Sequence, residues 1–206
     1  MLISLNILGR SPVAGQAKTR LIPLLGERGA AQAHERMMSY VLTIASGWCQ
    51  RDSGRKLAVW VAPDLDHPFF DALPSSVSRF CQPAGDLGCR LHWIAAAGLE
   101  KADAVVLLGA DGVSVTAALL DQVESALKRV PAVLAPAADG GYILLGMTRL
   151  APSLFSQMPW GTPQVAEQTR KRLEKLGWLW EEFPGQWDVD RPADWQRFQT
   201  HLLQKN

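Results

Sequence analysis

Residues 2–21 read LISLNILGRSPVAGQAKTRL, an apolar run that passes directly into a loop with glycine, proline and cations. The run LISLNIL predicts a strand that is apolar on both faces, as in a covered parallel sheet. Similar runs predict further strands at 56–62, 78–82, 103–109, 131–137 and 142–147. Amphipathic stretches predict helices at 29–48, 116–130 and 163–177, around 91–94, and from Pro192 onward. Strands and helices alternate, which indicates an α/β fold with a mostly parallel sheet. Two strand-like runs that meet at 139–141 without a helix between them predict a local antiparallel pair.

The loop after the first run carries groups that bind anions. Gly9 and Gly15 let backbone N–H groups approach a ligand, Lys18 supplies a compact charge, and Arg10 and Arg20 supply planar guanidinium groups. These groups suit a polyphosphate. The spacing is not that of a P-loop, GxxxxGK[ST]. The alternative is an ordinary exposed loop with solvated basic side chains.

Composition limits the possible partners. The chain has 206 residues, 48% of them hydrophobic, and we expect one domain over 1–206. A net charge of +1 gives no global field for nucleic acid or an anionic membrane, so anion recognition would be local. Cys49, Cys81 and Cys89 have no metal-ligand spacing, and we expect buried free thiols. No signal sequence or membrane span is expected, which favours a cytoplasmic protein.

Ligands of doubly wound sheets bind outside the carboxyl ends of the strands, so the residues that follow each strand are candidates for function. The third strand is followed by QPAGDLGCR (82–90), the fourth by GADG (109–112), and a later turn reads ADGGY (138–142). Asp86 could begin a helix whose N-terminus would also accept a base or phosphate. Asp139-Gly140 is also an ordinary hairpin turn signal.

Asp111 follows a buried strand, where its carboxylate could bind Mg²⁺. Magnesium takes one or two protein carboxylates together with phosphates and waters, and Asp188 and Asp190 are candidates for a second ligand. The alternative for Asp111 is a turn former or helix N-terminal acid. The four histidines have no ligand spacing and lie at no strand exit, and we assign them no chemistry.

Taken together, these motifs resemble a bacterial "transferase 1" family of uncharacterised glycosyltransferase-like proteins, the DUF2064 type. Its signature KxPxxGxxKTRL is similar to the first loop, and the resemblance continues through QPAGDLGCRL, GAD, PAADGGYILLGM, PWGTPQVAEQT and DVDRPADW, in order over nearly the whole chain. The family implies a Rossmann-like nucleotide-diphospho-sugar transferase (GT-A) fold, with three α/β/α layers and a mostly parallel mixed sheet.

The resemblance also implies residue roles. Lys18 and Arg20 would contact the triphosphate or leaving pyrophosphate and act in catalysis with Asp111. Further nucleotide-binding residues would be Gly9, Arg10, Gly15, Gln82, Gly85 and Asp86, with Gln82 and Gly85 near the base. The metal would be held by Asp111 with Asp188 or Asp190. The acceptor would lie near Asp139, Gly140, Gly141, Tyr142 and Trp160.

The expected activity is Mg²⁺-assisted nucleotidyl transfer from an NTP to a small phosphorylated acceptor. Positioning and electrostatics carry such reactions, and no protein nucleophile is required. The alternatives are glycosyl transfer from a nucleotide sugar and a non-catalytic nucleotide-binding module. Two departures from the family pattern favour the last: Val113 replaces a usual proline, and Gly161 replaces the usual serine of WST.

Overall fold

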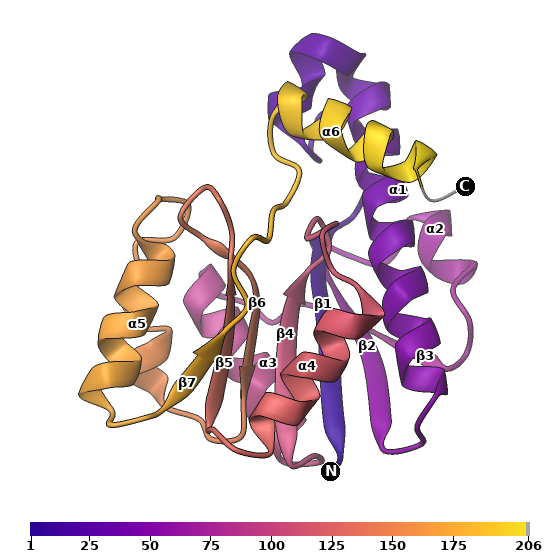
Figure 1. Cartoon of the computed structure of the whole chain (residues 1–206). Helices are drawn as coiled ribbons and strands as arrows, with labels where there is room; N and C mark the ends of the chain where they lie inside the picture. Colours follow the sequence, from indigo (N-terminus) through magenta and orange to yellow (C-terminus); the bar gives the residue numbers. More distant parts are fainter. Residues whose placement is uncertain (205–206) are drawn as a thin grey trace.

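The computed structural model describes residues 1–204, within which one seven-stranded sheet is flanked by helices (Figure 1). The strands are β1 (Ile3–Arg10), β2 (Arg55–Ala62), β3 (Val77–Cys81), β4 (Ala104–Gly109), β5 (Ala132–Pro136), β6 (Tyr142–Met147) and β7 (Trp180–Glu182). Their spatial order is β3-β2-β1-β4-β6-β5-β7. Strand β6 is antiparallel to β4 and β5, and the other pairs are parallel. The predicted mostly parallel α/β sheet and its antiparallel pair are both confirmed.

The helices are α1 (Ile22–Gln50), α2 (Pro68–Asp71), α3 (Leu87–Leu99), α4 (Ala117–Leu127), α5 (Val165–Lys175) and α6 (Pro192–Leu203), with short 3₁₀ turns η1 (Thr19–Leu21) and η2 (Pro152–Leu154). Helix α1 begins earlier than predicted, and Gly26, at φ 70°, interrupts its first turns. Thr116 caps α4, because its hydroxyl accepts the Leu119 N–H at 3.0 Å. Pro163 lies two residues before α5 and does not open it.

Two apolar cores lie on opposite faces of the sheet. On one face, Ile3, Leu5 and Ile7 of β1 pack in a cluster with residues of α1, α4 and α6. On the other face, residues of β4, β5 and β6 pack in a cluster with residues of α3 and α5. Figure 1 shows the same separation, with α4 in front of the sheet and α3 behind it. The expected three α/β/α layers are present.

The segment from Phe183 to Arg191, called the strap below, passes over the top of the sheet and enters α6 (Figure 1). Its Trp187 N–H donates to Ser114 Oγ at 3.0 Å, and its Val189 N–H donates to the Asp111 carbonyl at 3.3 Å. Helix α6 packs on α1 through the rings of Phe198 and Tyr40, whose centroids are 5.4 Å apart. The strap and α6 are thereby fastened to the β4 exit and to α1.

The cysteines are less buried than predicted. All three are free thiols, but Cys81 and Cys89 are exposed and Cys49 is only partly buried. Cys81 ends the edge strand β3 and Cys89 lies in the first turn of α3, both at the margin of the core. Burial raises the pKa of the Cys49 thiol to about 11. Among the described residues no helix combines the length and apolar character needed to cross a membrane.

Candidate functional site

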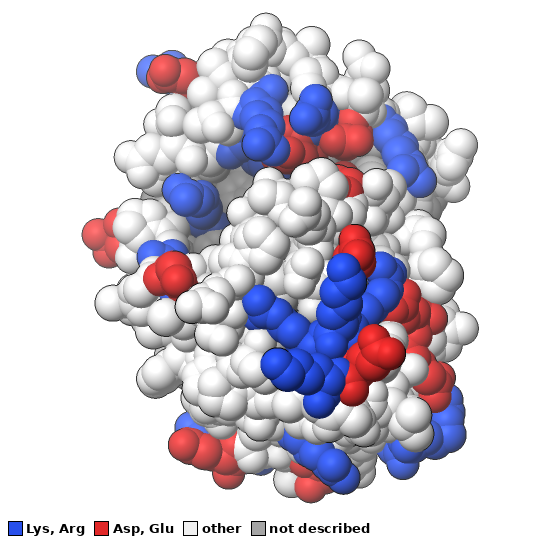
Figure 2. Space-filling model, turned by 90° about the vertical axis from the view of Figure 1, so that its left-hand side faces the viewer, with Lys and Arg blue, Asp and Glu red and all other residues white. Residues whose placement is uncertain are grey.

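A cavity of about 750 Å³ opens where β1 and β4 end. The predicted residues that line it are Gly9, Arg10, Lys18, Arg20, Gln82, Gly85, Asp86, Asp111 and Asp190. Figure 2 shows basic side chains around a hollow in the upper part of the molecule, with acidic side chains among them. The sheet has therefore brought residues from three strand exits and the strap to one concave surface.

Lys18 lies at the base of this cavity in an unusual backbone conformation. Its φ of 48° and ψ of 49° fall in the left-handed region, which is uncommon for residues other than glycine. The side chain is only 9% exposed. Its Nζ donates to Asp111 Oδ2 at 2.6 Å and also to the Val189 carbonyl. The ammonium thus joins the first loop, the β4 exit and the strap.

Lys18 and Asp111 form a charged pair. Burial by itself would lower the pKa of Lys18, but the carboxylates of Asp111, Asp188 and Asp190 outweigh it, and the pKa is raised. Burial would likewise raise the pKa of Asp111, but the ammonium of Lys18 outweighs it, and the pKa is lowered. Both groups are therefore ionised at neutral pH.

Asp188 brings a further carboxyl group to the same charges. Burial, with repulsion from Asp111 and Asp139, raises its pKa to about 7, although Lys18 opposes the shift. The carboxyl groups around the Lys18 ammonium therefore carry more negative charge than this one cation can neutralise. A divalent cation would relieve this excess, so the donor set of Asp111 and Asp188 fits one. Among the described residues no cluster of three or more His, Cys, Asp or Glu side chains could hold a metal ion.

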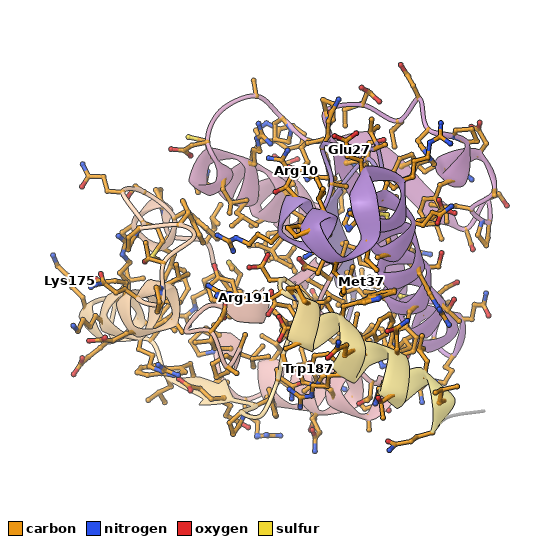
Figure 3. The ribbon with its side chains drawn as sticks, turned by 90° about the horizontal axis from the view of Figure 1, so that it is seen from above. Arg10, Glu27, Met37, Lys175, Trp187 and Arg191 are labelled. Atoms are coloured by element: carbon orange, nitrogen blue, oxygen red, sulfur yellow. The ribbon has the colours of Figure 1, made fainter. Side chains whose placement is uncertain are left out.

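Asp190 contacts the site differently from Asp188. Its carboxylate accepts a hydrogen bond from Arg20 Nη1, and both residues line the cavity. Seen from above in Figure 3, Arg191 lies near the centre of the molecule, where the strap enters α6, and Lys175 lies at the outer edge of α5. Of the two acids predicted as alternatives, Asp190 lines the cavity and pairs with Arg20, whereas Asp188 does not line it but interacts electrostatically with Asp111.

The side-chain amide of Gln82 already forms hydrogen bonds within the protein. Its Nε2 donates to the carbonyls of Gly9 at 2.9 Å and Trp60 at 3.1 Å, and its Oε1 accepts from Arg90 at 3.3 Å. Arg90 also donates to the Gly85 carbonyl at 2.9 Å and lines the cavity. Gln82 therefore positions the strand ends, and Arg90 is the more available group. Arg90 was not predicted, although it ends the motif QPAGDLGCR.

Asp86 caps α3, because its Oδ1 accepts the Cys89 N–H at 2.8 Å. The simple interpretation of this residue as a helix start is confirmed, and the residue also lines the cavity.

His34 is a second cavity residue that the sequence did not reveal. It is 5% exposed, lies on α1 and shares a 2.9 Å hydrogen bond with the Arg10 carbonyl through Nε2. Its Nδ1 and the hydroxyl of Ser11 are buried and have no hydrogen-bond partner among the described residues. Burial and the charge of Lys18 lower the pKa of His34. A neutral imidazole thus supports the first loop, and only the fold reveals this placement.

The turn after β4 is well formed despite the valine at position 113. The Gly112 N–H donates to the Gly109 carbonyl at 3.1 Å, and the Val113 N–H donates to the Asp111 carbonyl at 2.8 Å. The Val113 side chain is fully buried in the core. These hydrogen bonds and this burial fix the turn without proline.

The predicted acceptor residues do not line the main cavity. Asp139 to Gly141 form the hairpin turn between β5 and β6, in which Asp139 Oδ1 accepts the Gly141 N–H at 2.9 Å. Tyr142 meets Trp160 edge to face, at 6.4 Å between ring centroids. Its hydroxyl is buried without a partner in the described residues, and burial raises its pKa. Of these predicted residues, Asp139 interacts with the site, because its charge helps to raise the pKa of Asp188. Gly15 also lies outside the cavity lining, in the loop turn at φ 77°.

Residues 45–162 match the family described as an uncharacterized protein conserved in bacteria, DUF2064. The chain belongs to this family. The DUF2064 member has no match among curated proteins.

Solved structures share the fold. A protein of Desulfovibrio desulfuricans G20, described as a candidate nucleotide-diphospho-sugar transferase, is 27% identical with a TM-score of 0.82, covering 93% of this chain and 84% of its own. A CMP:2-keto-3-deoxy-manno-octonic acid synthetase complexed with CTP is 14% identical with a TM-score of 0.62, covering all of both chains. A 4-diphosphocytidyl-2C-methyl-D-erythritol synthase of Anaerococcus prevotii DSM 20548 is 10% identical with a TM-score of 0.61, covering 98% and 96%. The expected nucleotide-diphospho-sugar transferase-like fold is confirmed.

Proposed function

We propose that this DUF2064 protein is a nucleotide-using transferase that moves a nucleotidyl group from an NTP to a small phosphorylated acceptor. The observation that carries the proposal is the Lys18–Asp111 ion pair at the base of a 750 Å³ cavity beyond the strand ends. The named activities of the CTP-bound synthetase and the erythritol synthase, which share the fold, support the same class of reaction.

The cations of the cavity would bind the phosphates. Lys18 brings a buried ammonium, and Arg10, Arg20 and Arg90 bring guanidinium groups whose planar donors match phosphate oxygens. The N-terminus of α3, beside Gly85, adds backbone N–H groups and the positive end of the helix dipole. Charge that develops on a leaving pyrophosphate would be stabilised by groups already in place.

Asp111 and Asp188 would hold a divalent cation such as Mg²⁺, which would neutralise phosphate charge and so favour displacement at phosphorus. The repulsion between these two carboxyl groups, seen in the raised pKa of Asp188, supports this assignment. Asp190, paired with Arg20, would instead hold that guanidinium at the cavity mouth.

The proposal is tested by thermal denaturation with NTPs, NDPs and sugar nucleotides, each with and without Mg²⁺. A ligand at about 100 times its Kd adds about 2.7 kcal/mol, which raises the Tm by about 5–10 °C in a chain of this size. We expect a Mg²⁺-dependent shift that Asp111→Asn abolishes and the exposed-site control Asp71→Asn retains. No shift with any nucleotide would contradict the proposal.

The released product then identifies the reaction. Pyrophosphate from an NTP supports nucleotidyl transfer. Release of a nucleoside diphosphate from a sugar nucleotide, with no pyrophosphate from any NTP, would assign glycosyl transfer instead. Binding without turnover of any nucleotide would assign a non-catalytic module.

A further inference from the structure

Part of the sheet has no helix over it on the α3 side. Helix α3 packs closely on β1 and β4 at Gly98, where an added Cβ would lie 2.7 Å from Val105 Cγ2 and 3.3 Å from Ser4 Oγ. Figure 1 shows α3 behind the middle of the sheet, with β2 and β3 extending beyond it. A groove of about 530 Å³ remains between α3 and the exposed face of β1, β2 and β3. Its volume is in the range of small-molecule sites.

One end of this groove has an aromatic wall. The ring of Trp60 on β2 stacks on Phe80 of β3 at 4.5 Å and meets Trp93 of α3 edge to face at 5.5 Å. Phe80 is 43% exposed and Trp93 is 51% exposed, whereas Trp60 beneath them is 6% exposed. Adjacent large aromatic side chains that are exposed to water form a surface to which an apolar group binds favourably.

The aromatic wall is held in place by buried hydrogen bonds. Trp60 Nε1 donates to Asn6 Oδ1 at 2.8 Å, and Asn6 Nδ2 donates to the Ser4 carbonyl and Ser4 Oγ, both at 3.0 Å. Asn6 is 2% exposed and has its polar atoms satisfied. Small side chains, including Ala58, Ser78 and Ala97, line the space beside the wall. The groove is therefore preformed, and the Trp60 indole is already oriented before a ligand binds.

The other end of the groove is basic. Lys56 is the second residue of β2, four residues before Trp60, and Lys101 follows the end of α3, eight residues after Trp93. Since α3 runs back along the strands, both lysines lie at the end away from the aromatic wall. None of the described residues that line the groove is acidic, and neither lysine has a salt bridge within residues 1–204.

We propose that this groove binds a small amphipathic anion, with a flat apolar body against Trp60, Phe80 and Trp93 and a carboxylate or similar acid toward Lys56 and Lys101. The aromatic wall selects the body, and the unpaired lysine charges select the sign of the head group. The groove shares no lining residue with the cavity that contains Lys18 and Asp111. This site therefore stands independently of the proposed transferase function.

The test uses 2-naphthoate and its neutral match 2-naphthamide, measured by calorimetry and by the tryptophan indole N–H signals in NMR. We expect saturable binding of one naphthoate per chain, with shifts of the Trp60 and Trp93 signals. Naphthoate should bind about tenfold more tightly than naphthamide, and Lys56→Gln/Lys101→Gln should remove that advantage. The control Lys128→Gln/Lys175→Gln changes the same charge on other surfaces and should leave it intact.

Filling the groove provides the second arm of the test. Ala97→Phe should abolish naphthoate binding, and Ser78→Phe on the edge strand β3 tests the same point with a substitution at an exposed position. Equal affinity for both probes, or unchanged binding in a groove-filled variant that folds, would overturn the proposal. Sedimentation that shows a dimer dissociated by Ser78→Phe would assign the face to a second copy of the chain and would also overturn it.

Discussion

At the scale of single residues, Lys18 links separate parts of the candidate site, because its ammonium donates to Asp111 and to the Val189 carbonyl. We expect Lys18→Met to weaken nucleotide binding by at least tenfold, because the substitution removes the buried ammonium and leaves Asp111 unpaired. Calorimetric titration with the nucleotide that gives the largest thermal shift measures this effect. Lys171→Met on α5 is the control, since Lys171 forms an ion pair with Glu167 at the surface, away from the site. Equal affinity in wild type and Lys18→Met would show that the Lys18 ammonium takes no part in nucleotide binding.

Asp188 gives the protein a distinct pH dependence. Its pKa of about 7 in the folded chain exceeds the ordinary value of 3.8, so the folded state holds this proton more tightly than the unfolded chain does. As the pH rises from about 4 to 7, the free energy of unfolding therefore falls, and above pH 7 the loss stays constant. In metal-free buffer, Asp188→Asn should stabilise the protein by about 2 kcal/mol at pH 8, or about 5 °C in Tm. At pH 4 the gain should nearly vanish, and a gain of equal size at both pH values would contradict this account.

The sequence led to Lys18, Asp111 and the strap acids because each follows a strand or stands in a motif. It did not reveal His34, which lies mid-helix on α1 and reaches the Arg10 carbonyl only after the helix packs on the sheet. Gln82 lines the cavity and its place near a base stays a prediction, but the sequence did not reveal that its amide donates to the carbonyls of Gly9 and Trp60. Local patterns identify which positions reach the crevice, whereas hydrogen-bond partners depend on the tertiary packing.

At the scale of elements, the β5–β6 hairpin is fastened to the start of α5 through Gly140. An added Cβ there would collide with the Pro163 carbonyl, and φ is 90°. We expect Gly140→Ala to cost about 3 kcal/mol or more, because strain and overpacking add. The control Gly177→Ala, at φ 65° and with no described atom within 4 Å of the added Cβ, should cost only about 1 kcal/mol. Urea denaturation compares the two variants, and equal losses would show that the contact with Pro163 is easily relieved.

Longer elements were predicted better than short ones. The apolar runs located β1 to β6 to within two residues, most clearly for β4 and β5, which are buried on both faces and therefore apolar throughout. Strand β7 escaped prediction: its three residues, Trp180 to Glu182, are only partly buried and too few to show a period. Helix α2, with four residues, escaped for the same reason. The early part of α1 was missed because Gly26 reads as a break, and the helix resumes beyond it.

At the scale of the whole molecule, the single domain over 1–206 remains a prediction. We expect one cooperative unfolding transition, with the same midpoint by tryptophan fluorescence and far-ultraviolet circular dichroism. Phe198, fully buried, joins α6 to the core shared by α1 and β1. Phe198→Ala should therefore lower that one transition, with a loss of about 3–5 kcal/mol. Two separate midpoints, with only one moved by the substitution, would show that the C-terminal part unfolds on its own.

The hydrogen bond from Lys18 to Val189 spans 171 positions of the chain. During synthesis the first strand and its basic loop leave the ribosome long before the strap exists. Until then Lys18 has no Val189 carbonyl to bind, and neither Asp188 nor Asp190 is present to balance the cations around it. A nascent chain, or one terminated before residue 189, would therefore carry the loop without its site, and competence to bind would come only once the strap has been synthesised.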